Sequence, residues 1–284
     1  GVTHLVYAAY TERATMAETT APNLAMLTNL LDGLRAAGAP LRHVVLIGGG
    51  KSYGEHLGPY RTPAKESDPR FLGPIFYNEQ EDLLAFRADR DGFTYTVLRP
   101  DVAIGFGLGS PMNLLGAIGV YAALSKAEGV PLRFPGAPGT WTALHQFTDT
   151  DLLASAVRWA LDAGTARNEV FNVTNGDNFR WQHLWADIAA VFDMPTAVPQ
   201  PMRLAVQMAD RSAAWDALTV RHGLREVPYR QIASWEFADG VWWSDYDMVQ
   251  STIRIRQAGF TDCVDSHHSI TSKLRHLREQ RYLP

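Results

Sequence analysis

The stretch that most constrains the fold is residues 44–84, where a short apolar run is followed by a long loop and a helical pattern. Val44 to Ile47 are all aliphatic, and glycines 48 to 50 end the run. Such a run is typical of a strand buried on both faces of a parallel sheet. Ligands of open α/β sheets bind beyond the carboxyl ends of the strands, which is where Lys51 lies. A lysine there, with Tyr77 on the next helix, would suit carbonyl or enone reduction.

Alternating strands and helices are predicted on both sides of this stretch. Apolar periodicity and Gly/Pro stops predict strands at 4–9, 43–47, 95–99, 131–136 and 168–176, and helices at 19–37, 74–89, 112–128, from about 150, and at 179–192. Strand–helix–strand spacing of this kind favours a parallel, right-handed, Rossmann-like α/β sheet. We expect residues 1–104 and about 146–174 to form that sheet domain. A smaller, mainly helical substrate lobe is expected from 105–145 and 175–284.

Composition excludes several classes of protein. The 284 residues are 46% hydrophobic, enough to bury a substantial core. A net charge of −4 argues against a nucleic acid or an anionic membrane as partner. The single cysteine, Cys263, excludes an intrachain disulfide and fits a reducing compartment. No apolar run is long enough to span a membrane and no signal peptide is recognised, so a cytoplasmic location is expected.

Three motifs resemble those of an extended short-chain dehydrogenase/reductase. They are R-P-x-x-x-x-G at 99–105, F-x-D-x-D-L at 147–152 and E-x-F-N-V at 169–173. That superfamily normally carries a Tyr-x-x-x-Lys pair. In this chain Tyr77 is followed at that distance by Glu81, and no other tyrosine has a lysine four positions later.

This departure resembles one branch, the progesterone 5β-reductase/iridoid synthase-like enzymes. That branch places its lysine in a G-x-K-x-Y loop, here 49–53, and its tyrosine in an F-Y-x-x-x-E-D helix, here 76–82. A G-P-Y step at 58–60 and a G-F-x-x-x-S-x-M-N segment at 105–113 are also similar. The resemblance extends from the first residue to the C-terminal Leu-Pro.

The resemblance implies NADPH-dependent reduction of the C=C bond of an activated enone, or of a carbonyl. Tyr77 would stabilise and protonate the carbonyl oxygen, and Lys51 would favour its phenolate form and hold a cofactor ribose hydroxyl. The implied partner is a small hydrophobic enone or ketone, and a homodimer is an open alternative. The NADP(H)-binding residues implied are Ala8, Ala9, Gly48, Pro100, Val102, Ser110 and Pro111. The implied walls of the substrate pocket are Tyr10, Tyr60, Phe106, Met112 and Trp141.

The glycine-rich turn that cradles a dinucleotide pyrophosphate is not found in the sequence. Matched to the resembled branch, residue 1 falls just before the fourth strand. Either the sequence belongs to a longer protein, or the chain cannot hold NADP(H) in the usual way and would need another chain to complete its sheet. The second case favours a non-catalytic binding or regulatory module. A sugar-nucleotide epimerase or dehydratase is another alternative, although it would normally need the missing Tyr-x-x-x-Lys pair.

The remaining polar clusters have structural interpretations. Asp149 and Asp151 are predicted to cap a helix. Adjacent His267 and His268 would point apart on a helix, so no metal site is expected. No G-x-S-x-G elbow supports a hydrolase. The tryptophans after residue 200 are predicted to lie in the core.

Overall fold

The computed structural model describes residues 1–284, and the chain divides into two compact units. The first unit comprises Gly1–Asp101, Asp151–Thr174 and Gln250–Asp262. The second comprises Val102–Thr150, Asn175–Val249 and Cys263–Pro284. The segment Gln250–Asp262 therefore packs with the first unit, although the sequence placed it in the C-terminal lobe.

A four-stranded parallel sheet forms the centre of the first unit. Its strand order is β1-β2-β3-β6, with β1 at His4–Tyr7, β2 at His43–Ile47, β3 at Thr94–Pro100 and β6 at Glu169–Val173. Val45 of β2 pairs with Val6 on one side and with Thr96 on the other. The predicted parallel α/β sheet flanked by helices is confirmed.

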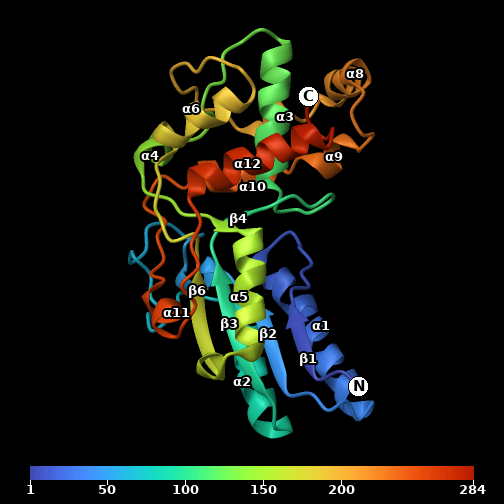
Figure 1. The fold of residues 1–284 in the computed structure, drawn as a ribbon, viewed down its shortest axis with the longest axis vertical. Helices are drawn as coiled ribbons and strands as arrows, with labels where there is room; N and C mark the ends of the chain where they lie inside the picture. The colour runs from blue at the N-terminus through green and yellow to red at the C-terminus, as the bar shows by residue number, and fades with distance from the viewer. The chain divides into compact units, whose positions relative to one another are not determined.

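Helices cover both faces of this sheet. In Figure 1, α1 (Met16–Ala36) and α2 (Phe76–Asp91) lie behind it and α5 (Thr150–Asp162) lies in front. Helix α1 begins three residues earlier than predicted because Thr15 and Glu18 form a capping box. Core contacts between α1, α2 and the strands involve Leu27, Leu31, Leu84, Ala88, Val44, Leu46 and Val97. Three short helices complete the unit, η1 (Gly50–Tyr53), η2 (Gly164–Ala166) and α11 (Ile253–Gln257).

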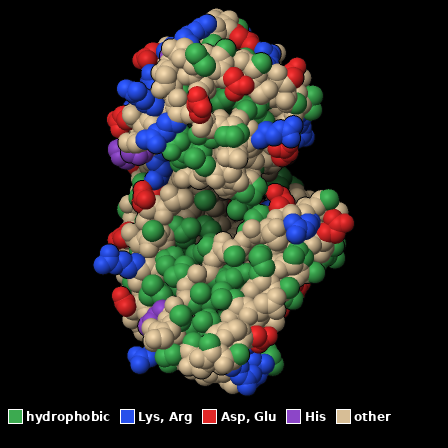
Figure 2. Space-filling view, turned by 90° about the vertical axis from the view of Figure 1, so that its right-hand side faces the viewer, with side chains coloured by type: hydrophobic (Ala, Val, Ile, Leu, Met, Phe, Trp, Pro, Cys, Tyr) green, Lys and Arg blue, Asp and Glu red, His purple; other side chains and the backbone are tan.

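The edge strand β1 leaves apolar side chains in contact with solvent. It pairs only with β2, and Val6 on it is 45% exposed. Figure 2 shows hydrophobic side chains gathered on this unit, in the lower half of the view. An apolar face of this kind is a surface that proteins normally cover.

The second unit is mainly helical around a cluster of aromatic side chains. Its helices are α3 (Leu114–Ala127), α4 (Pro138–Thr142), α6 (Trp181–Val191), α7 (Leu204–Gln207), α8 (Ser212–His222), α9 (Tyr229–Ile232), α10 (Trp235–Trp242) and α12 (Ser266–Glu279). Two short strands, β4 (Ala103–Ile104) and β5 (Thr148–Asp149), pair in parallel. Trp215, Trp235 and Trp242 are buried in the core, as predicted, whereas Trp243 is only half-buried and packs against the core from outside.

One predicted element of this unit is wrong. Residues 131–136 form no strand, and only Leu132 makes an isolated bridge, to Thr196. The segment begins with Pro131 and contains Pro135, and proline has no N–H to donate to a strand neighbour. Elsewhere the expected helical content after residue 195 is confirmed.

Asp149 and Asp151, predicted as helix caps, do different things. The Asp149 carboxylate accepts a hydrogen bond from Ser269 at 2.5 Å and pairs with Lys273 at 3.1 Å, which joins α12 to β5 within the second unit. Asp151 lies in the first turn of α5, where its negative charge interacts favourably with the positive end of the helix dipole. None of the helices is both long enough and apolar enough to serve as a membrane span.

Candidate active site

The hydroxyl of Tyr77 lies against the backbone that leads into the Lys51 loop. Tyr77 is the second residue of α2, and Gly49 follows β2 by two positions. A methyl group built on Gly49 would stand 2.9 Å from Cζ of Tyr77 and 3.1 Å from its hydroxyl oxygen. Only a glycine allows so close an approach, so the G-x-K-x-Y and F-Y-x-x-x-E-D motifs meet at this contact.

Lys51 is held in η1, a single 3-10 turn. The turn closes at Gly54, whose φ of +77° favours glycine. Tyr53 fixes the loop from within, since its hydroxyl donates to Oδ1 of Asn172 at 2.5 Å. The Arg99 guanidinium lies 5.0 Å from the centre of the Tyr53 ring. The loop is thereby fastened to β3 and β6, while Lys51 itself stays half-buried.

Glu81 occupies the position that is lysine in the usual Tyr-x-x-x-Lys pair. Its carboxylate accepts from Nε of Arg99 at 2.8 Å and from Nη2 at 2.6 Å. Both side chains are only 6% exposed. The acidic residue of the F-Y-x-x-x-E-D motif therefore binds the arginine of the R-P motif, and the space of the usual lysine is filled.

Burial governs the protonation of Tyr77. It raises the pKa of the phenol, and Tyr10 and Glu55 raise it further. The hydroxyl therefore keeps its proton at neutral pH, which suits a hydrogen-bond donor. Lys51 was expected to lower the pKa of Tyr77, so the observed direction is the opposite one. The ammonium of Lys51 acts instead on two neighbouring groups. It opposes the raised pKa of Glu55, and together with burial it lowers the pKa of His56.

An aromatic stack joins Tyr10 to the same place. Tyr10 lies 5.3 Å from Phe76, and Phe76 lies 4.0 Å from Tyr77, measured between ring centres. Tyr10, predicted as a pocket wall, is thus connected to Tyr77 through the ring of Phe76. Tyr60 is half-buried in the loop between η1 and α2. Its role as a pocket wall stays a prediction.

The cofactor residues predicted in the first unit lie where neighbouring strands end. Ala8 and Ala9 follow β1, Gly48 follows β2, and Pro100 ends β3. Ala8 and Ala9 are exposed, and small residues of this kind let a ligand approach the backbone closely. At Gly48 a methyl group would meet Val97 at 3.3 Å, so glycine is favoured there. These residues fit the edge of the sheet that binds dinucleotides in this fold.

The other predicted site residues belong to the second unit. Asn113 organises their segment: its side chain caps α3 by accepting from the amide of Gly116 at 2.9 Å and donates to the carbonyl of Ile232 at 3.1 Å. Phe106 packs on Tyr282 with ring centres 4.8 Å apart, and Trp141 packs on Phe134 at 5.1 Å. Functional roles for this group stay predictions; its other members are Val102, Ser110, Pro111 and Met112.

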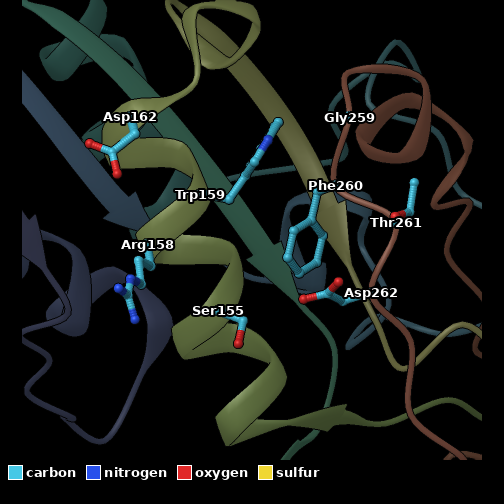
Figure 3. A pocket seen from close by; sticks show the side chains of 8 residues that line it. All are labelled: Ser155, Arg158, Trp159, Asp162, Gly259, Phe260, Thr261 and Asp262. Carbon is cyan, nitrogen blue, oxygen red and sulfur yellow. The ribbon is translucent and has the colours of Figure 1, made fainter.

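The first unit has an open surface hollow, and none of the predicted site residues lines it (Figure 3). It has a volume of about 350 Å³. Trp159 of α5 and Phe260 face one another there, with ring centres 5.7 Å apart. The remaining lining residues are Ser155, Arg158, Asp162, Gly259, Thr261 and Asp262.

Sequence reasoning missed three polar residues near Lys51. Glu55, Asp101 and Gln250 gather around the η1 turn, and Asp101 and Gln250 are 7% and 2% exposed. Glu55 follows the G-x-K-x-Y motif by two residues, which is the one signal that could have drawn attention to it. Gln250 lies about 200 residues away in the sequence, and nothing local marks it.

A parallel sheet with a tyrosine and a lysine loop at its strand ends defines a Rossmann-type fold of the short-chain dehydrogenase/reductase kind. The fold is similar to that of RMD from Pseudomonas aeruginosa, solved in complex with NADPH (TM-score 0.65, 17% identity, 96% of this chain and 81% of that one). It is also similar to that of UDP-glucose 4-epimerase from Thermotoga maritima (TM-score 0.64, 15% identity, 97% and 77%). At such identities these similarities show the fold alone.

The family follows from the sequence. The PRISE-like Rossmann-fold domain matches residues 1–262, and the chain belongs to that family. Among curated relatives, an (S)-8-oxocitronellyl enol synthase of Nepeta racemosa is 37% identical over 86% of this chain, which spans 64% of that relative's length. One from Camptotheca acuminata is 32% identical over 100% of this chain and 75% of its own length. The predicted resemblance is confirmed.

Proposed function

We propose that this protein is an NADPH-dependent reductase of a small hydrophobic enone or enal. The contact between Tyr77 and Gly49 is the observation that carries the proposal. It brings a phenol to the loop of Lys51, at the strand ends where this fold binds dinucleotides. Membership of the PRISE-like family supports the same assignment.

Bound NADPH would supply a hydride to the β-carbon of the C=C bond. The protein's own part is to stabilise the negative charge that then develops on the carbonyl oxygen. Tyr77 is suited to this role because its raised pKa keeps a proton on the oxygen that faces the site. One such donor is worth on the order of 10²–10³ in rate. Lys51 would hold a ribose hydroxyl and add a positive charge nearby.

The names of the relatives favour C=C reduction over carbonyl reduction. They are synthases of 8-oxocitronellyl enol. An enol is what remains when hydride adds to the β-carbon of an enal and the oxygen is protonated. Hydride addition to the carbonyl carbon would instead leave an allylic alcohol. The proposed substrate class is therefore an α,β-unsaturated aldehyde or ketone with an apolar chain or ring.

An epimerase-type reaction is disfavoured by the contacts of Glu81. That reaction would normally need a lysine four residues after the tyrosine, and this position holds a carboxylate in a buried ion pair with Arg99. A non-catalytic module remains the alternative from another class, and NADPH binding separates it from a reductase.

The experiment is a comparison of the full-length protein with Tyr77→Phe. Consumption of NADPH is followed with open-chain enals, cyclic enones and a steroid enone, and products are identified as saturated carbonyl or allylic alcohol. We expect turnover in the variant to fall at least tenfold. Tyr121→Phe is the matched control, because that hydroxyl donates to the carbonyl of Arg133 in the second unit. Equal turnover of Tyr77→Phe and the unmodified protein would refute the assignment, and failure to bind NADPH would favour the non-catalytic module.

A further inference from the structure

We propose that the carboxyl of Glu55 is a further positioning residue for the Tyr77–Lys51 pair, and that it acts in its uncharged form. This inference rests on the proposed function and deepens it. Glu55 belongs to the loop that follows η1, and no motif of the family resemblance includes it.

Close packing over Gly50 fixes the Glu55 side chain. A methyl group on Gly50 would stand 2.1 Å from Oε2 of Glu55 and 2.6 Å from Nε2 of Gln250. The carboxyl and the amide therefore both lie directly over the residue that precedes Lys51. Gln250 is held in turn, because its backbone forms a parallel bridge with Ala64.

The titratable groups that interact with Glu55, or with its neighbours Lys51 and Tyr77, come from several segments of the chain. Burial raises the pKa of its carboxyl, Asp101 after β3 raises it further, and Lys51 of η1 opposes this rise. Glu55 also contributes to the raised pKa of Tyr77 on α2, and so does Tyr10. The pKa of His56 is lowered, first by burial and then by the charge of Lys51. Glu55 is thus a carboxyl within electrostatic reach of both proposed catalytic groups.

The charge balance explains why the uncharged form is needed. With a proton on Glu55, the ammonium of Lys51 is balanced by the carboxylate of Asp101. Loss of that proton adds a second negative charge to the pocket. Since hydride addition places negative charge on the oxygen that Tyr77 binds, an ionised Glu55 would raise the barrier by repulsion. Turnover should therefore fall on the alkaline side as Glu55 ionises.

The substitution that isolates this effect is Glu55→Gln, which preserves shape and removes the titration. We expect the kcat of this variant at neutral pH to stay within about threefold of the unmodified protein, and its alkaline loss of kcat to disappear. His56→Gln is the matched control from the same loop. It should leave the alkaline loss in place, because the pKa of His56 is lowered and the imidazole is already neutral there.

A second variant guards against a simple folding defect. Asp101→Asn removes the negative charge that raises the pKa of Glu55, so the alkaline loss of kcat should move to lower pH. A purely structural role for Glu55 predicts no such movement. An unchanged pH profile in both Glu55→Gln and Asp101→Asn would overturn the proposal.

A readout without substrate separates this proposal from the proposed function. The folded pKa of Glu55 is raised above 4.5, so its contribution to stability is present at acid pH and is lost as pH rises. The Tm of the unmodified protein should therefore fall relative to that of Glu55→Gln as pH rises above 4.5. If the difference in Tm between Glu55→Gln and the unmodified protein does not change with pH, Glu55 is not protonated and the proposal is refuted. If the difference grows with pH but the protein reduces no enone, only the reductase assignment is refuted.

Discussion

Glu81 and Arg99 form a buried bidentate ion pair, with N–O distances of 2.8 and 2.6 Å. It lies one helical turn after Tyr77, where the usual dehydrogenase lysine would point toward the cofactor. A lysine at this position would face the Arg99 guanidinium, so the catalytic cation has to come from elsewhere. Lys51 on the η1 turn is the cation that this chain offers.

Removing only one partner of this ion pair should lower the stability of the fold. Arg99→Met leaves the Glu81 carboxylate buried with only the longer contact to Arg70 at 3.5 Å. We expect the free energy of unfolding to fall by about 3 to 5 kcal/mol, measured by denaturant titration. The double variant Arg99→Met/Glu81→Leu should recover much of that loss, because no uncompensated charge remains. Additive losses in the double variant would contradict a coupled pair.

The contact between Gly49 and Tyr77 predicts a second effect. Gly49 has a φ of −178°, an extended conformation that any residue adopts, so alanine there would be opposed by the Tyr77 ring alone. Gly49→Ala should displace the hydroxyl and lower kcat by about tenfold or more, because donor geometry sets the stabilisation of the oxyanion.

Two comparisons make this test specific. In a Tyr77→Phe background, Gly49→Ala should lower the remaining kcat little further, since both changes remove one interaction. Gly164→Ala is the control, because its added methyl group would meet nothing within 4 Å. Independent losses in the double variant would show that Gly49 acts through another group.

Much of the fold could be predicted because the signals are local. The aliphatic run of β2 and the spacing of Leu27 and Leu31 in α1 report burial directly. The start of α1 was missed because its capping box, Thr15 with Glu18, precedes the apolar pattern. The strand predicted at 131–136 is absent. Its apolar residues favoured a strand, but Pro131 and Pro135 cannot donate the backbone hydrogen bonds that a strand needs.

The site was predictable only in part for a different reason. Lys51 and Tyr77 stand in recognisable motifs, yet their surroundings come from distant segments. Asp101 and Gln250 reach the η1 turn through tertiary packing. The raised pKa of Tyr77 is likewise a product of burial, which a motif does not encode. The family resemblance implied that Lys51 favours a phenolate, whereas burial, Tyr10 and Glu55 raise the pKa of Tyr77 and favour the phenol.

Tyr53 offers a test of how the Lys51 loop is held. Tyr53→Phe removes the hydrogen bond to Oδ1 of Asn172 and leaves that fully buried acceptor without it. We expect a loss of about 1 to 3 kcal/mol in unfolding free energy. Because the bond anchors the loop, the KM for NADPH should also rise. Tyr121→Phe should cost similar stability in the second unit without affecting KM, and equal KM effects of the two variants would refute the anchoring role.

Acid should weaken the fold through His43. This side chain is fully buried on β2, its ring nitrogens lie 2.8 Å from Thr94 and 3.2 Å from Thr96, and burial lowers its pKa to about 4. The unfolded chain, with a pKa near 6.5, binds the proton first, so stability present above pH 6.5 is lost as pH falls toward 4, by at most about 3 kcal/mol.

In His43→Leu both threonine hydroxyls keep backbone acceptors, at Arg42 and Ala166. The unfolding free energy of His43→Leu relative to the unmodified protein should therefore improve between pH 7 and 4, whereas that of Val44→Ala should stay constant. A pH-independent difference for His43→Leu would show that the imidazole takes up its proton at the same pH in the folded and unfolded chains, and would refute the lowered pKa.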